Sequence, residues 1–185
     1  MKKYKKYDFP VEEVRRFIEP GPIVLISSSW KGEQDIMTMG WHMIIEFSPS
    51  LIAGYIWEEN HSFELIRKSK ECVINIPTVE LAKIVVQIGN CSGTEVDKFT
   101  EFGLSAGKAK KVQAPLIEEC YANLECKLVD TQLIKKYSLF IFEVVKAHAA
   151  RHPQNPQTIH YRGDGDFMVA GRSLHLKRYF RPEML

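Results

Sequence analysis

The sequence lacks the features that mark several large protein classes. No apolar run approaches the roughly 18 residues that a membrane-spanning helix needs. The first ten residues, MKKYKKYDFP, are basic but have no apolar segment behind them, so we expect no signal peptide. The formal net charge of +2 is too small to indicate nucleic-acid binding. We therefore expect a cytoplasmic protein that binds neither a membrane nor a nucleic acid.

Motifs for several common chemistries are also missing. The sequence contains no GxGxxG or GxxxxGK[ST] phosphate loop, and no GxSxG motif of the kind that hydrolases use. Its four cysteines form no CxxC pair, and no histidine lies at zinc-finger spacing from them. A hydrolase or a zinc protein is therefore disfavoured, and a nucleotide would have to be held by some other device. Cys91 lies in a Gly/Ser loop and is the one cysteine with a credible chemical role.

The residues that are present predict a mainly β fold with helical decoration. At 185 residues, with 45% hydrophobic and 26% charged residues, the chain is typical of one globular domain. Short segments rich in β-branched and aromatic residues are separated by turn signals, which favours a β-barrel. The expected strands are Ile23–Trp30, Ile36–Phe47, Leu51–Trp57, Cys72–Ile76, Cys120–Leu128, Tyr137–Val145, His160–Arg162 and Phe167–Val169, and the expected helices are Asp8–Glu19, Ser62–Lys70, Val79–Ile88 and Thr94–Phe102. The first two strands should form a hairpin.

The first candidate site is the segment Thr38-Met39-Gly40-Trp41, inside the second expected strand. A glycine within a strand pattern often marks a place where a ligand or another backbone comes close. Backbone N–H groups of this segment could donate hydrogen bonds to a flat heteroaromatic ring, with Trp41 shielding that ring from water. An ordinary strand with a tryptophan in the core explains the same residues, so both interpretations stay open.

Two polar segments form the other candidates. Asn60 and Ser62 stand just before an expected helix, where they could cap it or could bind phosphate together with its free N–H groups. In Asn90–Lys98, the residues Ser92-Gly93-Thr94 offer backbone donors and Lys98 offers a charge that suits phosphate. An ordinary loop with a solvated lysine has the same composition.

Metal binding is not expected. His42 and His61 are separated in the sequence and have no third ligand beside them, which is weak evidence for a metal site.

The order and spacing of these segments resemble the flavin reductase-like, FMN-binding split-barrel family, and within it the flavoredoxins. The SG-x-x-VDKF loop and the VNIP-like strand are the most specific parts. The matching segments are Ile23–Ser29, Asp35–Trp41, Glu59–Phe63, Cys72–Pro77, Ser92–Phe99, Ala114–Ile117 and Cys120–Leu128. The resemblance covers about residues 20–171, so residues 1–185 are expected to form one such domain with an added N-terminal helix and C-terminal tail.

This resemblance implies a homodimeric split β-barrel with non-covalently bound FMN. The residues expected to contact the isoalloxazine ring are Thr38, Met39, Gly40 and Trp41, and those expected around the ribityl chain and phosphate are Asn60, Ser62, Cys91, Ser92, Gly93 and Lys98. The chain departs from the family at Glu58 and Glu59, where members often carry a basic residue. Trp57 is then available to stack on a ring.

The resemblance also implies redox function. The first hypothesis is an FMN-dependent oxidoreductase that passes electrons from NADH or NADPH to an acceptor. The second is an FMN-bearing electron carrier that exchanges electrons with a redox partner protein. The third is a split-barrel protein that binds another ligand. In the first two, FMN performs the redox chemistry and the protein positions it.

Overall fold

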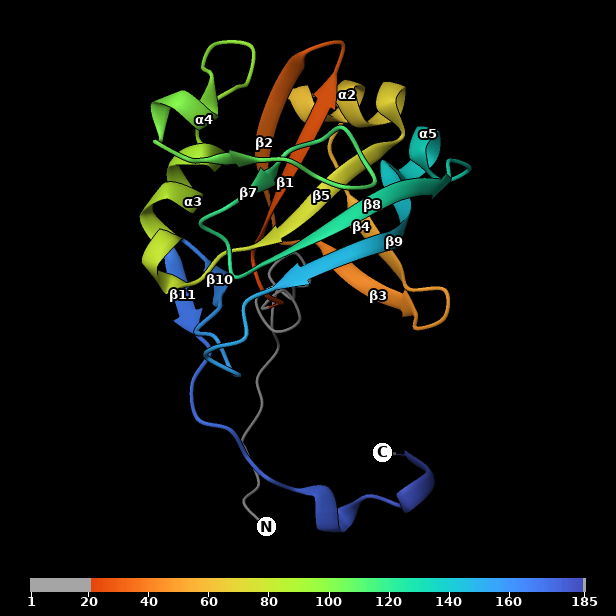
Figure 1. The fold of residues 1–185 in the computed structure, drawn as a ribbon, viewed down its shortest axis with the longest axis vertical. Coiled ribbons are helices and arrows are strands. Elements are labelled where there is room, and N and C mark those ends of the chain that lie inside the picture. Colours follow the sequence, from red (N-terminus) through yellow and green to blue (C-terminus); the bar gives the residue numbers. More distant parts are fainter. Residues whose placement is uncertain (1–20, 185) are drawn as a thin grey trace, which may run out of the picture.

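The computed structural model describes residues 21–184, and its main feature is one curved antiparallel sheet (Figure 1). Seven strands lie in the order β2-β1-β5-β8-β9-β4-β3, which confirms the expected mainly β split barrel. The bounds of these strands are β1 Val24–Trp30, β2 Glu33–Met39, β3 His42–Glu46, β4 Leu51–Tyr55, β5 Glu71–Ile76, β8 Ala122–Asp130 and β9 Leu139–Ala149. The helix expected at Asp8–Glu19 lies outside the described residues.

The expected hairpin is present, but its second strand is divided. β1 pairs with β2, so that Val24 faces Met39 and Trp30 faces Glu33. The prediction of a single strand over 36–47 is wrong, because β2 ends at Met39 and β3 begins at His42 on the opposite edge of the sheet. Gly40 and Trp41 carry the chain across. Apolar residues continue through this crossover, so the pattern contains no sign of it.

Both faces of β1 are buried, which fixes β1 and its neighbour β2 within the fold. Val24 and Ile26 pack in the cluster that contains Phe140 and Phe142. Leu25, on the other face, packs in a second cluster with Val85. Successive strand residues point to opposite faces, and each buried aliphatic side chain contributes about 1.5–3 kcal/mol.

The helices cover the two sides of this hairpin. Helix α2 packs on β1 and β2 through the buried Phe63, Leu65 and Ile66, and α3 packs on β2. The expected helix 94–102 is a single turn, α4, because Asp97 accepts hydrogen bonds from Phe99 N and Thr100 N and starts the helix only there. The bounds are α2 His61–Ser69, η2 Val79–Leu81, α3 Ala82–Gly89, α4 Lys98–Glu101 and α5 Ile134–Tyr137.

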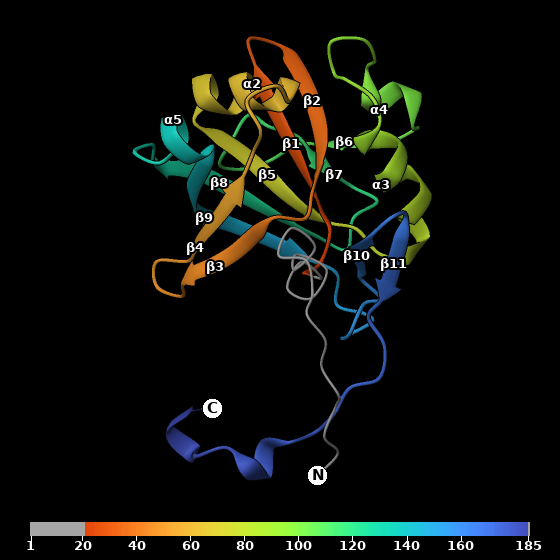
Figure 2. The same cartoon turned by 180° about the vertical axis from the view of Figure 1, so that it is seen from behind.

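Two further pairs of short strands complete the fold. The pair β6 Ala106–Gly107 and β7 Leu116–Ile117 was not expected from the sequence, whereas β10 Ile159–Gly163 and β11 Asp166–Val169 form the hairpin that the glycine-rich turn predicts. After β11 the chain leaves the domain as an extended tail with single turns η3 Lys177–Tyr179 and η4 Pro182–Met184 (Figures 1 and 2). Within residues 21–184, no helix combines the length and apolar character that crossing a membrane requires.

Candidate functional site

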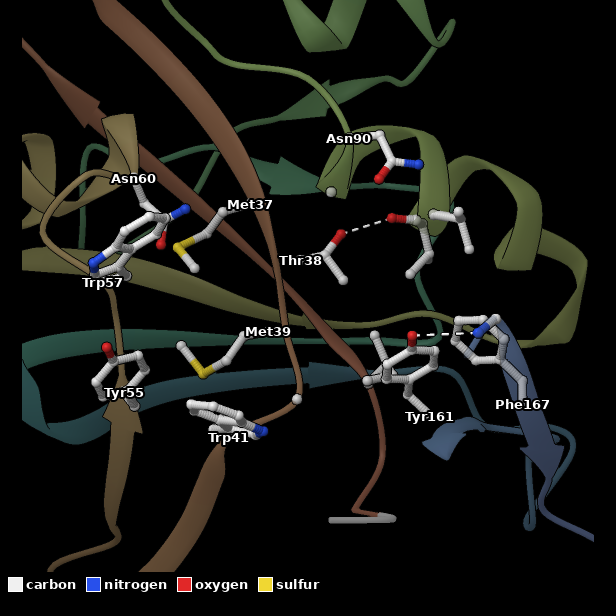
Figure 3. Close-up of a pocket in the computed structure, with 16 residues that line it drawn as sticks. Met37, Thr38, Met39, Trp41, Tyr55, Trp57, Asn60, Asn90, Tyr161 and Phe167 are labelled. Carbon is white, nitrogen blue, oxygen red and sulfur yellow. Dashed lines mark hydrogen bonds between the residues drawn. The ribbon is translucent and has the colours of Figure 1, made fainter. Parts of the chain in front are cut away.

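A cavity of about 520 Å³ opens where the chain crosses from β2 to β3 (Figure 3). Its walls come from β2, from the segments around β4 and α2, from α3, and from the β10–β11 hairpin. The lining residues are Ile23, Met37, Thr38, Met39, Gly40, Trp41, Tyr55, Trp57, Asn60, Val85, Val86, Gly89, Asn90, Tyr161, Gly165 and Phe167. None of these side chains is charged, so the cavity suits a largely apolar, planar molecule held by a few polar groups.

The lining side chains lie on both sides of the end of β2 (Figure 3). We call the group with Met37, Met39, Trp41, Tyr55, Trp57 and Asn60 the first lobe, and the group with Thr38, Val85, Asn90, Tyr161 and Phe167 the second lobe. Met37 and Met39 point to one side of β2, and Thr38 points to the other, where its Oγ1 donates to Val85 O at 2.7 Å (Figure 3). Because β2 is an edge strand of the sheet, its outer backbone groups point away from β1, and those at its C-terminal end face the cavity. The cavity therefore offers backbone donors and acceptors between two apolar lobes.

Close packing holds the crossover in place. A Cβ at Gly40 would lie 3.0 Å from Ile23 Cδ1, which is tighter than about nine in ten natural Cβ contacts. Tyr55 N donates to Trp41 O at 2.9 Å, and the two aromatic rings lie 5.3 Å apart. Trp41 is 53% exposed, so the alternative interpretation of a ring in the core does not hold, and its indole lines the cavity.

Asn60 brings the start of α2 to the first lobe. It occupies the N-cap position of α2, but its side chain makes no capping hydrogen bond and lines the cavity instead. The first N–H groups of a helix have no partner within the helix, so those of His61 and Ser62 can meet a negatively charged group at this end. Trp57, also half-exposed, lines the cavity beside Asn60.

Apart from Thr38 and Asn90, which belong to candidate segments of the sequence, the second lobe consists of residues that the sequence analysis did not assign to the site. Val86, Gly89 and Asn90 come from α3 and its C-terminus, and Tyr161 and Phe167 come from the hairpin. The rings of Tyr161 and Phe167 lie 5.0 Å apart, and Tyr161 Oη accepts a hydrogen bond from Gly165 N at 3.3 Å. The turn at residues 163–165 was visible in the sequence, but nothing in the sequence placed this hairpin beside β2.

Three predicted phosphate-binding residues instead surround a buried carboxylate. Ser62 Oγ donates to Asp35 Oδ2 at 2.5 Å, and Lys98 Nζ lies 3.0 Å from Asp35 Oδ1. Lys98 also donates to Ile36 O at 2.6 Å and is almost fully buried. A Cβ on Gly93 would lie 2.5 Å from Asp35 Cγ and 2.8 Å from His61 Cδ2, so any larger residue would have to displace these side chains. In this geometry the side chains of Ser62 and Lys98 are bound to Asp35 and do not line the cavity.

The remaining predicted loop residues, Cys91 and Ser92, do not line the cavity. Cys91 is half-buried, with its Sγ 3.7 Å from Ile88 O, and Ser92 Oγ forms a hydrogen bond with Thr94 Oγ1 at 2.8 Å.

Burial raises the pKa of the Cys120 thiol to about 12, with a further contribution from Glu119. Burial also raises the pKa of the Cys72 thiol, and the neighbouring Cys126 and Glu71 raise it further. Both thiols, Cys72 and Cys120, therefore stay protonated and are not available as nucleophiles.

The two histidines considered as metal ligands have separate partners. His42 Nε2 is 2.7 Å from Pro22 O, and His61 Nε2 is 2.9 Å from Glu33 Oε1. Among residues 21–184, no three His, Cys, Asp or Glu side chains come together in a way that could hold a metal ion.

The fold and the cavity define a split-barrel protein with an uncharged cavity beside β2. The family model described as the flavin reductase like domain matches residues 15–166, and the chain therefore belongs to this family. An uncharacterized protein of Archaeoglobus fulgidus is 35% identical over 111 residues, which make up 60% of this chain. The match spans 63% of that relative, so the chain covers less than two thirds of its length.

Solved structures share the same fold. An FMN-binding domain of a flavin reductase-like enzyme from Shewanella baltica is 25% identical, with a TM-score of 0.78 over 90% of this chain and 95% of that one. Flavoredoxin from Methanosarcina acetivorans is 21% identical, with a TM-score of 0.82 over 98% of this chain and 100% of that one.

Proposed function

We propose that this protein binds FMN without a covalent bond in the cavity beside β2 and acts as an FMN-dependent oxidoreductase. The observation that carries the proposal is the outer edge of β2, whose end at Thr38 and Met39 opens into an uncharged cavity with aromatic side chains on both sides. The protein belongs to the flavin reductase-like family, and the similar Shewanella domain is an FMN-binding one.

The residues present fit such a cofactor. A volume of about 520 Å³ lies within the range of 300–1,000 Å³ that is usual for ligand sites. Thr38, Met39, Gly40 and Trp41 would hold the ring through backbone groups and through the indole. Asn60 and the first N–H groups of α2 would hold the phosphate, and these groups take over the role that Lys98 was expected to share.

FMN, when bound, accepts electrons from one reactant and passes them to another. The chain itself contributes binding, orientation and exclusion of water. Backbone groups of β2 would set the hydrogen bonding around the ring, and Trp41 and Trp57 would limit access of water at the mouth. The second lobe, with Tyr161 and Phe167, offers an apolar surface on which a reduced nicotinamide or another planar reactant would lie.

Several finer expectations stay predictions. The assignment of Cys91, Ser92 and Gly93 to FMN is retained as a proposal, in which this loop borders the cavity next to Asn90. The nicotinamide donor, a redox partner protein and a cytoplasmic location are likewise retained as proposals. An electron carrier without nicotinamide turnover is the second candidate function, which the open mouth of the cavity permits.

We also propose that the protein is a homodimer in which β3 forms part of the interface. β3 is an edge strand, and apolar side chains on it and just after it are exposed: Met43, Ile44, Ile45 and Phe47. Such a group of exposed apolar side chains is typical of a protein–protein contact.

An absorption spectrum tests the proposed function. The purified protein, or the protein soaked with FMN and desalted, should show a flavin spectrum that bleaches quickly after anaerobic addition of NADH or NADPH. Bleaching with dithionite alone would favour the electron carrier. Absence of any flavin band after soaking would contradict FMN binding by the cavity.

A further inference from the structure

The C-terminal tail, residues 171–184, carries apolar side chains that contact little of its own chain. Leu174 is 73% exposed, and Leu176, Tyr179 and Phe180 are also exposed. Figures 1 and 2 show the tail running away from β11 and past the end of the domain. A tail of this length with four exposed large apolar residues is suited to a surface that these residues can cover.

The exposed β3 strand lies at the same end of the molecule as the tail in both views (Figures 1 and 2). Its side chains Met43 and Ile44 are exposed, and Phe47, just after it, is 87% exposed. The apolar side chains of the tail and those of β3 are exposed in the same structure. The tail therefore does not cover β3 of its own chain.

The charges of the two surfaces are complementary. The tail carries four basic side chains and one acidic one, which are Arg172, Lys177, Arg178, Arg181 and Glu183. The surface near β3 and the cavity mouth carries the exposed acids Glu46, Glu58 and Glu59. Opposite charges at the rim of an interface favour association and fix its orientation.

The exposed surface of β3 adjoins the cavity. Trp41 directly precedes β3, and Trp57 follows β4, the strand that pairs with β3. Both indoles are half-exposed at the mouth, so a segment lying on β3 would also border the mouth.

We propose that two copies of this chain exchange their tails, so that the tail of one copy lies on β3 of the other and borders the mouth of its cavity. This inference rests on the proposed homodimer. A two-fold dimer presents the same patch twice, so each tail meets the partner's β3 in the same way.

The test weakens the tail at two apolar side chains of the full-length protein. We expect Tyr179→Ser/Phe180→Ser to raise the dimer dissociation constant at least tenfold in sedimentation equilibrium. The control is Tyr137→Ser, which removes a similarly exposed ring from α5 (54% against 68% for Tyr179) and should leave the constant unchanged. A variant that dimerises like the wild type would overturn tail exchange while leaving the dimer in place.

A second measurement locates the contact without weakening it. A photoreactive benzoylphenylalanine at position 179 should give covalent dimers in which the tail is joined to the peptide that contains residues 42–47. Crosslinks within one chain, or dimers joined at another peptide, would overturn the proposal. A wild type that is monomeric at every concentration would overturn both the dimer and the exchange, whereas a flavin spectrum in that protein would still support FMN binding.

Discussion

The centre and the C-terminal end of β2 have opposite chemistry although they belong to one strand. At its centre, Asp35 is a buried carboxylate paired with Lys98 and Ser62. At its C-terminal end, Thr38 and Met39 line an uncharged cavity. The charged centre anchors the loop 91–98 and the start of α2 to the sheet, and the uncharged end is left free for a ligand. The difference shows that residues grouped as one site in the sequence can divide into a binding group and a supporting group.

The largest expected effect concerns the supporting group. Lys98→Ala leaves Asp35 buried without its cation, and breaking such a pair costs about 3–5 kcal/mol. Chemical denaturation should therefore show a large loss of stability. The control, Lys68→Ala, removes a half-exposed lysine of α2 that lies 3.4 Å from Glu64, and should change stability by less than about 1 kcal/mol.

A double variant separates charge from packing in this pair. Asp35→Leu/Lys98→Met removes both charges and should recover part of the lost stability. Stability of Lys98→Ala equal to that of the wild type would contradict the supporting role, and would return Lys98 to the list of phosphate-binding candidates.

The next effect distinguishes two glycines on either side of β2. Gly93→Ala places a methyl group against Asp35 and His61, and we expect a loss of about 1–3 kcal/mol, as for other overpacked sites. Gly89→Ala meets Thr38 at 3.5 Å, an ordinary contact, and should cost little. Thermal unfolding of the two variants checks the difference, and equal melting temperatures would argue against close packing at Gly93.

A third prediction concerns the binding group. Gly40→Val adds a side chain at the crossover, where even a Cβ would lie 3.0 Å from Ile23, and moves the backbone that would meet the ring. We expect FMN affinity to fall at least tenfold, about 1.4 kcal/mol, in a fluorescence titration. Thermal unfolding of the same variant checks that the fold remains. Unchanged affinity would show that the ligand does not approach Gly40.

The smallest expected effect tests a second buried carboxylate far from the cavity. Burial alone would raise the pKa of Glu125, but hydrogen bonds from His148 and from the N–H groups of Lys110 and Lys111 outweigh it and lower that pKa. A lowered folded pKa means that Glu125 stabilises the fold fully above its unfolded pKa of about 4.3, and that this contribution is lost as the pH falls through the folded value.

Removal of the histidine should reduce that pH dependence. In His148→Gln the pKa of Glu125 is lowered less, so acid should destabilise the variant less than the wild type, while near neutral pH the variant is less stable on the order of 1 kcal/mol. Melting temperatures between pH 3 and 7 check this. Parallel curves for the two proteins would contradict the assigned partner.

Local sequence patterns predicted the local structure. The alternation in Cys120–Leu128 predicted β8, and the polar start and basic end of the Ser62–Lys70 segment predicted α2. Both signals depend on residues within one element, which the sequence displays directly. The same reasoning joined β2 to β3, because apolar residues follow each other there whether or not the chain changes edge.

The long-range parts of the site could not be predicted in this way. Tyr161 and Phe167 meet β2 only through the packing of the hairpin, more than 100 residues away in the sequence. Lys98 was given to phosphate because nothing in the sequence shows that Asp35 lies within 3.0 Å of it. From the sequence alone, a lysine in an exposed loop cannot be told from a lysine in a buried ion pair.

The most direct test is an FMN titration of Asn60→Ala beside the wild type. Asn60 lines the cavity and makes no capping hydrogen bond through its side chain, so the variant should keep its melting temperature within a few degrees. We predict an FMN dissociation constant about tenfold higher than that of the wild type, the size expected for one lost hydrogen bond to a charged group. Equal dissociation constants for the two proteins would contradict the placement of FMN between Asn60 and the free edge of β2.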